Sequence, residues 1–330
     1  MTTEAHAAPR RPPLLAVVTL LTAVLTVLLI AFAWPSARSE PRDVPLAVAG
    51  PAPAVAQVKA ALDQAMPGGF ELTAVPDRAA AVQRIKDRDA YGAIVLDAAQ
   101  PEVLTASAGG PAVAQVLTQL AGRMQTPAKV TDLVPLPKDD PRGAGLAAGA
   151  LPLVLGGILA AAALTKLVRS GPKRMIGAIT FAVTGGLALA AVLQYWLGSF
   201  EGSYLGNAGV IAMSIAAISL TLLGLEWLLG TPGLALGGAV MMLLGNPLSG
   251  MTSAPEMLPS GWGALGQLLP PGAAGTALRS VSFFDGAGAG RPLVVLTCWL
   301  LVGLLCCGLG ALRSRGRAVP AGQEANPVPA

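Results

Sequence analysis

Few residues of this chain have a type and spacing that could do chemistry, and the first to consider are two charged residues at the ends of long apolar runs. Lys166 and Glu226 each stand near one end of such a run. Placing a charge in the hydrocarbon core of a membrane costs about 3 kcal/mol or more, so such residues pair, reach the interface or serve a function. Either the lysine snorkels and the glutamate is interfacial, paired with it or with Lys173, or the two form a gating contact at the inner mouth of a transport path.

Motifs for catalysis or metal binding are missing from the sequence. There is no P-loop, H-E-x-x-H, C-x-x-C or G-x-S-x-G motif. Cys298, Cys306 and Cys307 all lie in the last apolar run, and the single histidine is His6. We interpret the cysteines as small buried hydrophobes. We therefore assign no catalytic, cofactor-binding or metal-binding residue, and an enzyme is the least favoured of three function classes.

The composition is that of a membrane protein. Of 330 residues, 53% are hydrophobic and 12% are charged, whereas soluble domains carry about 25% charged residues. The mean hydropathy is +0.63. The net charge of +4 comes mostly from residues that flank apolar runs, and only 4% of residues are aromatic. This pattern predicts a lipid bilayer as the surrounding medium and argues against a nucleic-acid partner.

Apolar runs predict an α-helical polytopic membrane protein with six spans. The first, residues 14–34, is longer than the apolar core of a secretory signal, so we interpret it as a retained signal-anchor helix. The fifth is short for a membrane span, at 11 residues. The other spans are expected within a five-span membrane domain, residues 143–312. The five runs of this domain are residues 143–168, 176–197, 207–229, 234–244 and 292–312.

Basic residues predict the orientation of these spans. Arg10 and Arg11 precede the first run, and a second basic cluster joins the second and third runs. Three arginines, at positions 313, 315 and 317, follow the last run. The positive-inside rule places all three clusters in the cytoplasm. We expect a multi-pass plasma-membrane protein with both termini cytoplasmic, as disordered segments 1–13 and 313–330.

Residues 35–142 differ from the rest of the chain and predict an extracytoplasmic α/β domain between spans 1 and 2. This segment is balanced in charge and carries the strand and helix patterns of soluble proteins. The expected order is β-α-β-α-β-β-α, followed by a Pro- and Asp-rich linker over residues 130–142. The expected strands are residues 43–50, 70–75, 91–96 and 102–107, and the expected helices are residues 52–66, 78–88 and 111–124. The acids Asp97 and Glu102 are interpreted as solvated surface residues.

A Gly- and Pro-rich outer segment, residues 246–290, precedes the last span. Trp262, Leu265, Leu268 and Leu269 are spaced as in a helix that lies in the membrane interface. Other side chains of the segment are polar and either line an exit path or belong to a solvated loop; we prefer the loop. These are Asn246, Ser249, Thr252, Ser253 and Glu256.

The order of these parts resembles type-2 ABC exporter permeases, in particular the branch of the Pip/phage-infection-protein group. Residues 81–96 (AVQRIKDRDAYGAIVL) are similar to that group's helix followed by a "GAIVI" strand, and residues 104–119 to the strand and helix that come next. The resemblance covers residues 14–312. Within 246–285 it rests on Asn246-Pro247, residues 255–259 (PEMLP), residues 269–271 (LPP), Arg279 and Phe283-Phe284.

This resemblance implies a permease subunit of an ABC-type exporter. Such a subunit pairs with a second copy to give twelve spans and recruits a separate P-loop ATPase, so that ATP binds to the partner and no cofactor binds here. The candidate ATPase-facing loop is residues 169–175, with Arg169, Lys173 and Arg174. The family's coupling loop carries an acidic, Gly-Thr-containing motif, whereas this loop has neither feature. The alternative is therefore a permease-like scaffold or surface receptor without ATPase coupling.

Overall fold

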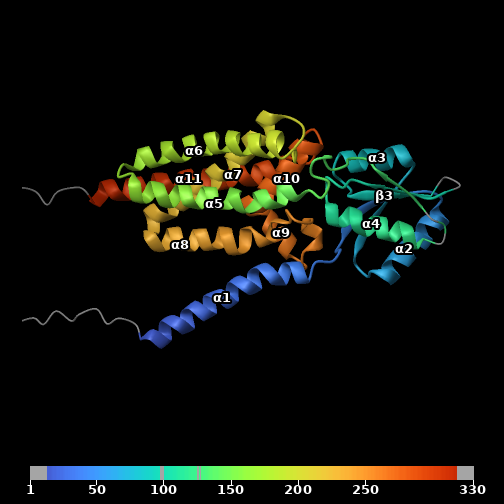
Figure 1. The fold of residues 1–330 in the computed structure, drawn as a ribbon, viewed down its shortest axis with the longest axis horizontal. Helices are drawn as coiled ribbons and strands as arrows, with labels where there is room; N and C mark the ends of the chain where they lie inside the picture. The colour runs from blue at the N-terminus through green and yellow to red at the C-terminus, as the bar shows by residue number, and fades with distance from the viewer. Residues whose placement is uncertain (1–12, 97–99, 125, 127, 318–330) are drawn as a thin grey trace, which may run out of the picture.

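The computed structural model describes residues 13–96, 100–124, 126 and 128–317. They form an α/β domain and a bundle of helices that lie end to end along the long axis of the molecule (Figure 1). We call the end of the bundle that carries the domain the domain end, and the opposite end the far end. Asp97, residues 1–12 and residues 318–330 lie outside the described residues. Residues 313–317, which were expected to be disordered, continue the last helix of the bundle, so that part of the prediction is wrong.

The α/β domain is built on a five-stranded mixed sheet with strand order β2-β1-β3-β4-β5. Strand β1 is parallel to β2 and β3, β4 is antiparallel to β3, and β5 is parallel to β4. The central strands β1 and β3 are buried on both faces, which explains their continuous apolar sequences. The strands are β1 (Val44–Ala49), β2 (Phe70–Val75), β3 (Gly92–Val95), β4 (Glu102–Thr105) and β5 (Lys129–Asp132).

Three helices cover the two faces of this sheet. Because side chains alternate along a strand, Leu46 and Val48 face one side of β1, while Ala47 and Ala49 face the other. The first face packs against α2 (Ala52–Ala65) and α4 (Pro111–Arg123), and the second against α3 (Arg78–Lys86). Figure 1 shows α3 on the opposite side of the sheet from α2 and α4.

The predicted order of the α/β domain is confirmed as far as α4, but the linker prediction is wrong in part. Residues 129–132, at the start of the expected linker 130–142, form strand β5. This strand lies at the edge of the sheet and its residues are mostly exposed. An exposed edge strand of four residues carries no apolar alternation, so its sequence resembles that of a loop.

The bundle is centred on helix α7, which is buried over most of its length. Helices α5, α6, α8, α10 and α11 all pack against α7. Helix α6 ends in a π-helical turn, Val192–Trp196. The bounds are α5 (Ala144–Leu167), α6 (Gly171–Ala191), α7 (Tyr204–Leu229), α8 (Thr231–Val240), α9 (Trp262–Gln267), α10 (Pro270–Phe283) and α11 (Gly290–Arg317).

Five helices of the described chain are long and apolar enough to cross a membrane: α1, α5, α6 with its π-helical turn, α7 and α11. The predicted fifth span is a shorter helix, α8, extended by the π-helical turn Met241–Gly245. Its 15 residues, at about 1.5 Å each, span about 22 Å, less than the hydrocarbon core of about 30 Å. The structure therefore shows a multi-pass membrane protein by helix length and composition, with five candidate spans rather than six.

The predicted outer segment contains a buried helix that sequence reasoning did not anticipate. Eleven of the 14 residues of α10 are buried, and the helix packs against α7 and α11. Its small residues, such as Ala273, Ala274 and Ala277, let neighbouring helices approach closely. Ser249 is also buried, and Asn246 and Glu256 are half-buried. The preferred interpretation of these residues as a solvated loop is therefore wrong for Asn246, Ser249 and Glu256, whereas Thr252 is exposed.

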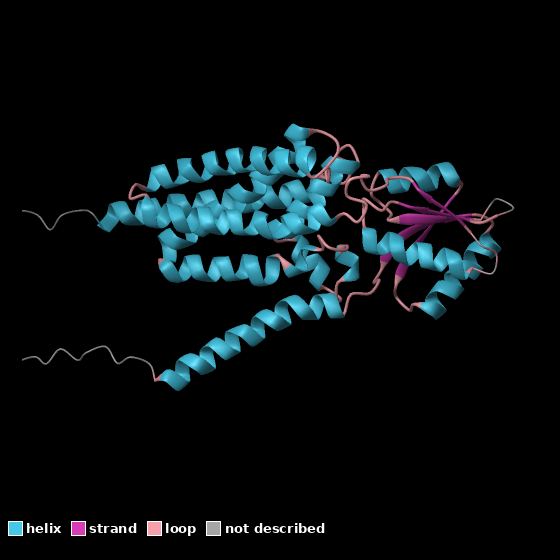
Figure 2. Ribbon diagram, viewed as in Figure 1, coloured by secondary structure: helices cyan, strands magenta, loops and turns pink. Residues whose placement is uncertain are grey.

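Helix α1 (Leu14–Ala37) diverges from the bundle, as the ribbon views show (Figures 1 and 2). Its most apolar stretch is not buried within the molecule. It contacts the bundle near its C-terminal end, where the rings of Trp34 and Trp262 pack edge to face with centroids 5.6 Å apart. The remaining apolar surface of α1 needs lipid or another chain to cover it.

Candidate functional site

The connection between α5 and α6 at the far end is shorter than predicted. Helix α5 ends at Leu167 and α6 begins at Gly171, so three residues, 168–170, join them. Ser170 precedes the first turn of α6, and Pro172 stands within that turn, where its missing N–H costs no helical hydrogen bond. The expected loop 169–175 is thus mostly helix, and Lys173 and Arg174 belong to α6.

Arg174 is held by contacts within the chain. Its Nη1 donates to Oε2 of Glu226 at 3.1 Å, its Nη2 to the carbonyl oxygen of Thr165 at 2.9 Å and its Nε to that of Val168 at 2.6 Å. The side chains of Arg174 and Glu226 are 16% and 18% exposed. One guanidinium therefore satisfies two carbonyls left open at the end of α5 and ties α5 and α6 to α7.

The predicted inner-mouth pair of Lys166 and Glu226 is wrong. Glu226 pairs with Arg174, while Lys166 and Lys173 are exposed. The short connection brings the first turn of α6 against the last turn of α5, which places Arg174 between α5 and α7. Arg169 is also exposed, so three basic side chains at the far end, Lys166, Arg169 and Lys173, remain available to solvent, lipid or a partner.

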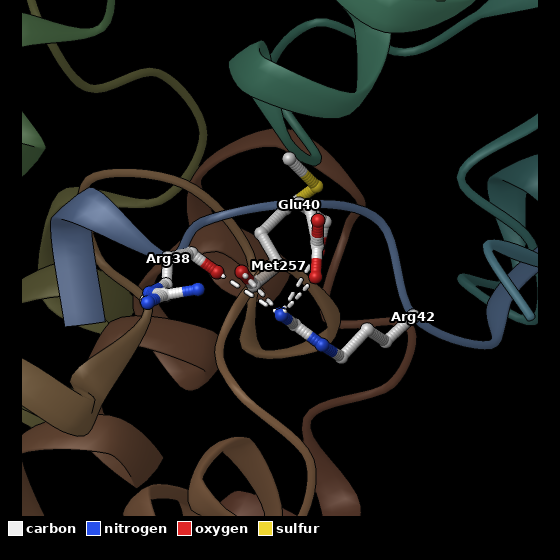
Figure 3. Close-up of polar contacts among 4 residues, drawn as sticks. All are labelled: Arg38, Glu40, Arg42 and Met257. Carbon is white, nitrogen blue, oxygen red and sulfur yellow. Dashed lines mark hydrogen bonds and ion pairs between the residues drawn. The ribbon is translucent and has the colours of Figure 1, made fainter. Parts of the chain in front are cut away.

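At the domain end, the segment between α1 and β1 is attached to the loop that contains the 3₁₀ turn Pro255–Met257. The backbone N–H of Glu40 donates to the carbonyl oxygen of Met257 at 3.1 Å, and that of Arg42 to Glu256 at 3.0 Å. Figure 3 shows the guanidinium of Arg42 among the carbonyl oxygens of Arg38 and Met257 and the carboxylate of Glu40. Both terminal nitrogens of Arg42 therefore hold this segment.

Arg88 connects the α/β domain to α10. It stands in the turn between α3 and β3 in a left-handed conformation, with φ of 64°. Its Nη1 donates to the carbonyl oxygen of Thr276 at 2.9 Å and to Oγ of Ser280 at 2.7 Å. Its guanidinium also lies 5.2 Å from the ring centroid of Phe284. Burial lowers the pKa of Arg88, although the group remains a cation at neutral pH.

A second contact joins the same two parts of the molecule. The hydroxyl of Tyr91 donates to Oε2 of Glu256 at 2.6 Å. Burial of the tyrosine, together with the charge of Glu256, raises the pKa of Tyr91 well above its usual value. The hydroxyl therefore stays protonated and serves as a hydrogen-bond donor at any physiological pH.

These contacts surround a cavity of about 450 Å³ between the α/β domain and the domain end of the bundle, which we call the junction cavity. Its volume lies in the range typical of small-molecule sites. Its lining includes the apolar side chains Ile85, Leu258 and Phe284 as well as charged groups. Its charged and polar lining includes Asp43, Arg88, Asp89, Tyr91, Glu256 and Arg291.

We found no match for this chain among family models, curated proteins or solved structures. The resemblance to type-2 ABC exporter permeases therefore stays a prediction. Within the described residues there is also no group of three or more His, Cys, Asp or Glu side chains placed to hold a metal ion.

Sequence reasoning did not identify the junction cavity. Tyr91 stands just before a buried strand, and Arg88 lies in the run Asp87-Arg88-Asp89, which has the composition of a solvated turn. Glu256 was noted among the polar residues of the outer segment, but its partner is 165 residues away in the chain. A contact over that distance leaves no periodic signal, although the proline-flanked PEMLP motif does mark the loop that carries it.

Proposed function

We propose that the chain is the membrane subunit of an ABC-type exporter, which moves a substrate outward together with a separate ATPase. The observation that carries the proposal is the arrangement of its parts: one apolar helix, an α/β domain, and a bundle whose buried helix α10 is hydrogen-bonded to that domain through Arg88. Any rearrangement of α7, α10 and α11 would be transmitted to the domain through Arg88. ATP would bind to the partner, and no covalent chemistry would occur in this chain.

The positive-inside rule supports a definite orientation for this proposal. The connection between α5 and α6 lies at the far end (Figure 1), and the basic residues in and beside it, Lys166, Arg169 and Lys173, are exposed. The far end would then face the cytoplasm of a bacterial cell. The α/β domain and the junction cavity would face the outside. Two copies would associate through apolar helix surfaces that the single chain leaves exposed, on α1, α6 and α11.

Under this proposal, fewer basic residues would be available to an ATPase than the sequence suggests. Arg174 is removed from the candidate set, because its guanidinium is committed to Glu226, Thr165 and Val168. The remaining candidates are the exposed Arg169 and Lys173, with Lys166 beside them. A partner at this end would contact short connections, since Gly230 alone separates α7 from α8.

These short connections favour a second candidate function, a permease-like scaffold or surface receptor that acts without an ATPase. A stable protein interface buries about 800 Å² on each side. A three-residue connection between α5 and α6 contributes little to such an area. In this case the α/β domain and the junction cavity would be the functional part, and the bundle would serve as their membrane support.

Crosslinking in membranes followed by affinity purification and mass spectrometry tests the two proposals. We expect a stoichiometric P-loop ATPase to co-purify with the wild-type chain and to be lost from the double variant R169E/K173E. The matched control is R123E, which reverses an exposed charge on α4 of the α/β domain and is expected to retain the ATPase. A known permease, treated in parallel, should capture its own ATPase under the same conditions. If this chain then captures none, the exporter proposal fails and the receptor proposal gains support.

A further inference from the structure

We propose that the junction cavity binds a small zwitterionic ligand, one that carries an ammonium group and a carboxylate or phosphate on a short apolar frame. The inference does not depend on an ATPase. It rests on the cavity, on two oppositely charged groups within it that form no ion pair at contact distance, and on the balance of charge in its lining.

The positive group is Arg88. Of its five N–H donors, those on Nη1 serve Thr276 and Ser280, while Nε and Nη2 make no hydrogen bond to any described residue. No carboxylate among these residues lies within ion-pair distance of the guanidinium. A half-buried arginine in this state presents a planar pair of donors that matches a carboxylate or a phosphate.

The negative group is Glu256. One oxygen accepts the hydrogen bond from Tyr91, and the other has no partner among the described residues. Within the same residues no lysine or arginine forms an ion pair with this half-buried carboxylate. Because this free oxygen belongs to a carboxylate that lines the cavity, it can accept hydrogen bonds from a ligand ammonium, and hydrogen bonds between ionised groups are the stronger ones.

The remaining lining fixes the class of ligand. Besides Arg88 and Glu256, the cavity is lined by the acids Asp43 and Asp89 and by Arg42 and Arg291, so that neither sign dominates. Arg42 is engaged elsewhere, and Arg291 is exposed at the rim. A dianion would bring like charge next to Glu256, and a dication next to Arg88. A zwitterion satisfies both groups, and the apolar wall around Ile85, Leu258 and Phe284 accommodates a short carbon frame.

This chemistry has two sources: a free metabolite such as a short peptide, or the headgroup of a zwitterionic lipid. We would reconstitute the full-length protein in nanodiscs of phosphatidylglycerol, which has no ammonium group. Titration calorimetry would then compare two zwitterions, phosphoethanolamine and alanyl-alanine, with ethanolamine and inorganic phosphate. We expect at least one zwitterion to bind about tenfold or more tightly than either singly charged probe.

Variants test the assignment of the groups. Glu256→Gln keeps an oxygen for the hydroxyl of Tyr91 and removes the charge, so we expect affinity for the zwitterion to fall about tenfold while the protein remains folded. The matched control is Glu71→Gln, which changes an exposed acid on β2 away from the cavity. Arg88→Lys is expected to retain one hydrogen bond to α10. It should lower the affinity for the zwitterion more than the affinity for ethanolamine, which has no anionic group.

A second experiment, with lipids, distinguishes a lipid headgroup from a free metabolite as the ligand. Nanodiscs of mixed phosphatidylethanolamine and phosphatidylglycerol, analysed by native mass spectrometry, would show selective retention of phosphatidylethanolamine by the wild type and its loss in Glu256→Gln if the ligand is a headgroup. Binding of the soluble zwitterion without such retention identifies a free ligand. If neither zwitterion binds more tightly than the single charges and no lipid is selected, or if Glu256→Gln binds as the wild type does, the proposal is overturned.

Discussion

Arg42, Arg88, Arg174 and Arg279 share one mode of contact, in which a guanidinium donates to backbone carbonyls of another segment. Arg279 illustrates it best: it is 2% exposed and donates to the carbonyl oxygens of Gly250, Met251 and Ser253. The planar group has five donors in fixed positions and can serve several carbonyls at once, which a lysine ammonium cannot do with the same geometry. In these segments, arginine serves as a structural connector.

Charge exchange at the far end tests this view. We expect Arg174→Met to destabilise the bundle by about 3 kcal/mol, because it leaves Glu226 without its cation. The exchanged variant R174E/E226R should not recover the loss, since the carbonyls of Thr165 and Val168 again lack a donor. Thermal unfolding in detergent measures both, with the exposed Lys173→Met as control. If the exchanged variant regained the full stability of the wild type, the ion pair alone would account for the contribution of Arg174.

Glu102 gives a pH-dependent prediction within the α/β domain. It was predicted to be a solvated acid, but its side chain is 13% exposed and accepts hydrogen bonds from Arg78 at 2.7 and 3.1 Å and from Thr131 at 2.7 Å. The hydrogen bonds from Arg78, more than any other contact, lower the pKa of Glu102 from 4.5 to about 2. A folded-state pKa below the unfolded one stabilises the protein above the unfolded pKa, and this contribution is lost as the pH falls towards 2.

The expected result is a difference between wild type and Glu102→Gln that depends on pH. At pH 7 the variant should be less stable by about 1 kcal/mol, a modest value because Arg78 is half exposed. The gap should close as the pH falls from about 4.5 towards 2, when the wild-type carboxylate also becomes neutral. Thermal melts across this range measure it, with Glu71→Gln as control. A difference in stability that stays constant with pH would contradict a lowered pKa for Glu102.

At the scale of elements, close packing around α7 depends on glycines. A Cβ at Gly303 of α11 would lie 2.6 Å from the backbone nitrogen of Thr221 and 2.8 Å from the carbonyl carbon of Leu220. A Cβ at Gly308 of the same helix would have no neighbour within 4 Å. Backbone atoms cannot move aside as the end of a flexible side chain can, so the two positions should differ sharply in their response to alanine.

We expect Gly303→Ala to lower the stability of the bundle by about 1–3 kcal/mol through overpacking against α7. Gly308→Ala should be neutral or slightly stabilising, because alanine favours a helix over glycine by up to about 1 kcal/mol. Detergent melts of the two variants, made in parallel, measure the difference. Equal behaviour of both would mean that α11 and α7 are not packed as described.

The sequence predicted elements well where burial leaves a pattern. Strand β2 has the bounds expected for it, residues 70–75, and α5 and α7 differ from prediction by a few residues at their ends. Helix α10 escaped prediction because small residues, prolines and an arginine make its sequence (PPGAAGTALRSVSF) look like a loop. Its burial depends on partners in α7 and α11, which no local pattern contains. The same is true of Arg88, whose partners lie on α10.

For the whole molecule, orientation in the membrane is the largest untested expectation. Cysteine labelling with a membrane-impermeant maleimide would test it after Cys298, Cys306 and Cys307 are replaced by alanine. We expect Gln83→Cys, exposed on α3, to react in intact cells, and Arg169→Cys to react only after permeabilisation. The reverse pattern would invert the topology.

The same assay decides whether α8 contributes a sixth crossing. Thr231 at its start and Ser260 beyond its end are both exposed. We expect Thr231→Cys to behave as the far end does, reacting after permeabilisation, and Ser260→Cys to react in intact cells. Labelling of both from one side would mean that α8 enters and leaves the membrane on that side, so that five helices cross.

The attachment of the α/β domain to the bundle has a consequence for the order of synthesis. One face of the sheet is completed by Phe284 and the other by Ala254 and Met257, more than a hundred residues after the last strand has been made. During translation the domain would be synthesised first. Both faces of its sheet would keep exposed apolar patches until residues 254–284 have been synthesised. Chains halted before residue 254 are therefore expected to be substrates for chaperones and proteases on the domain's side of the membrane.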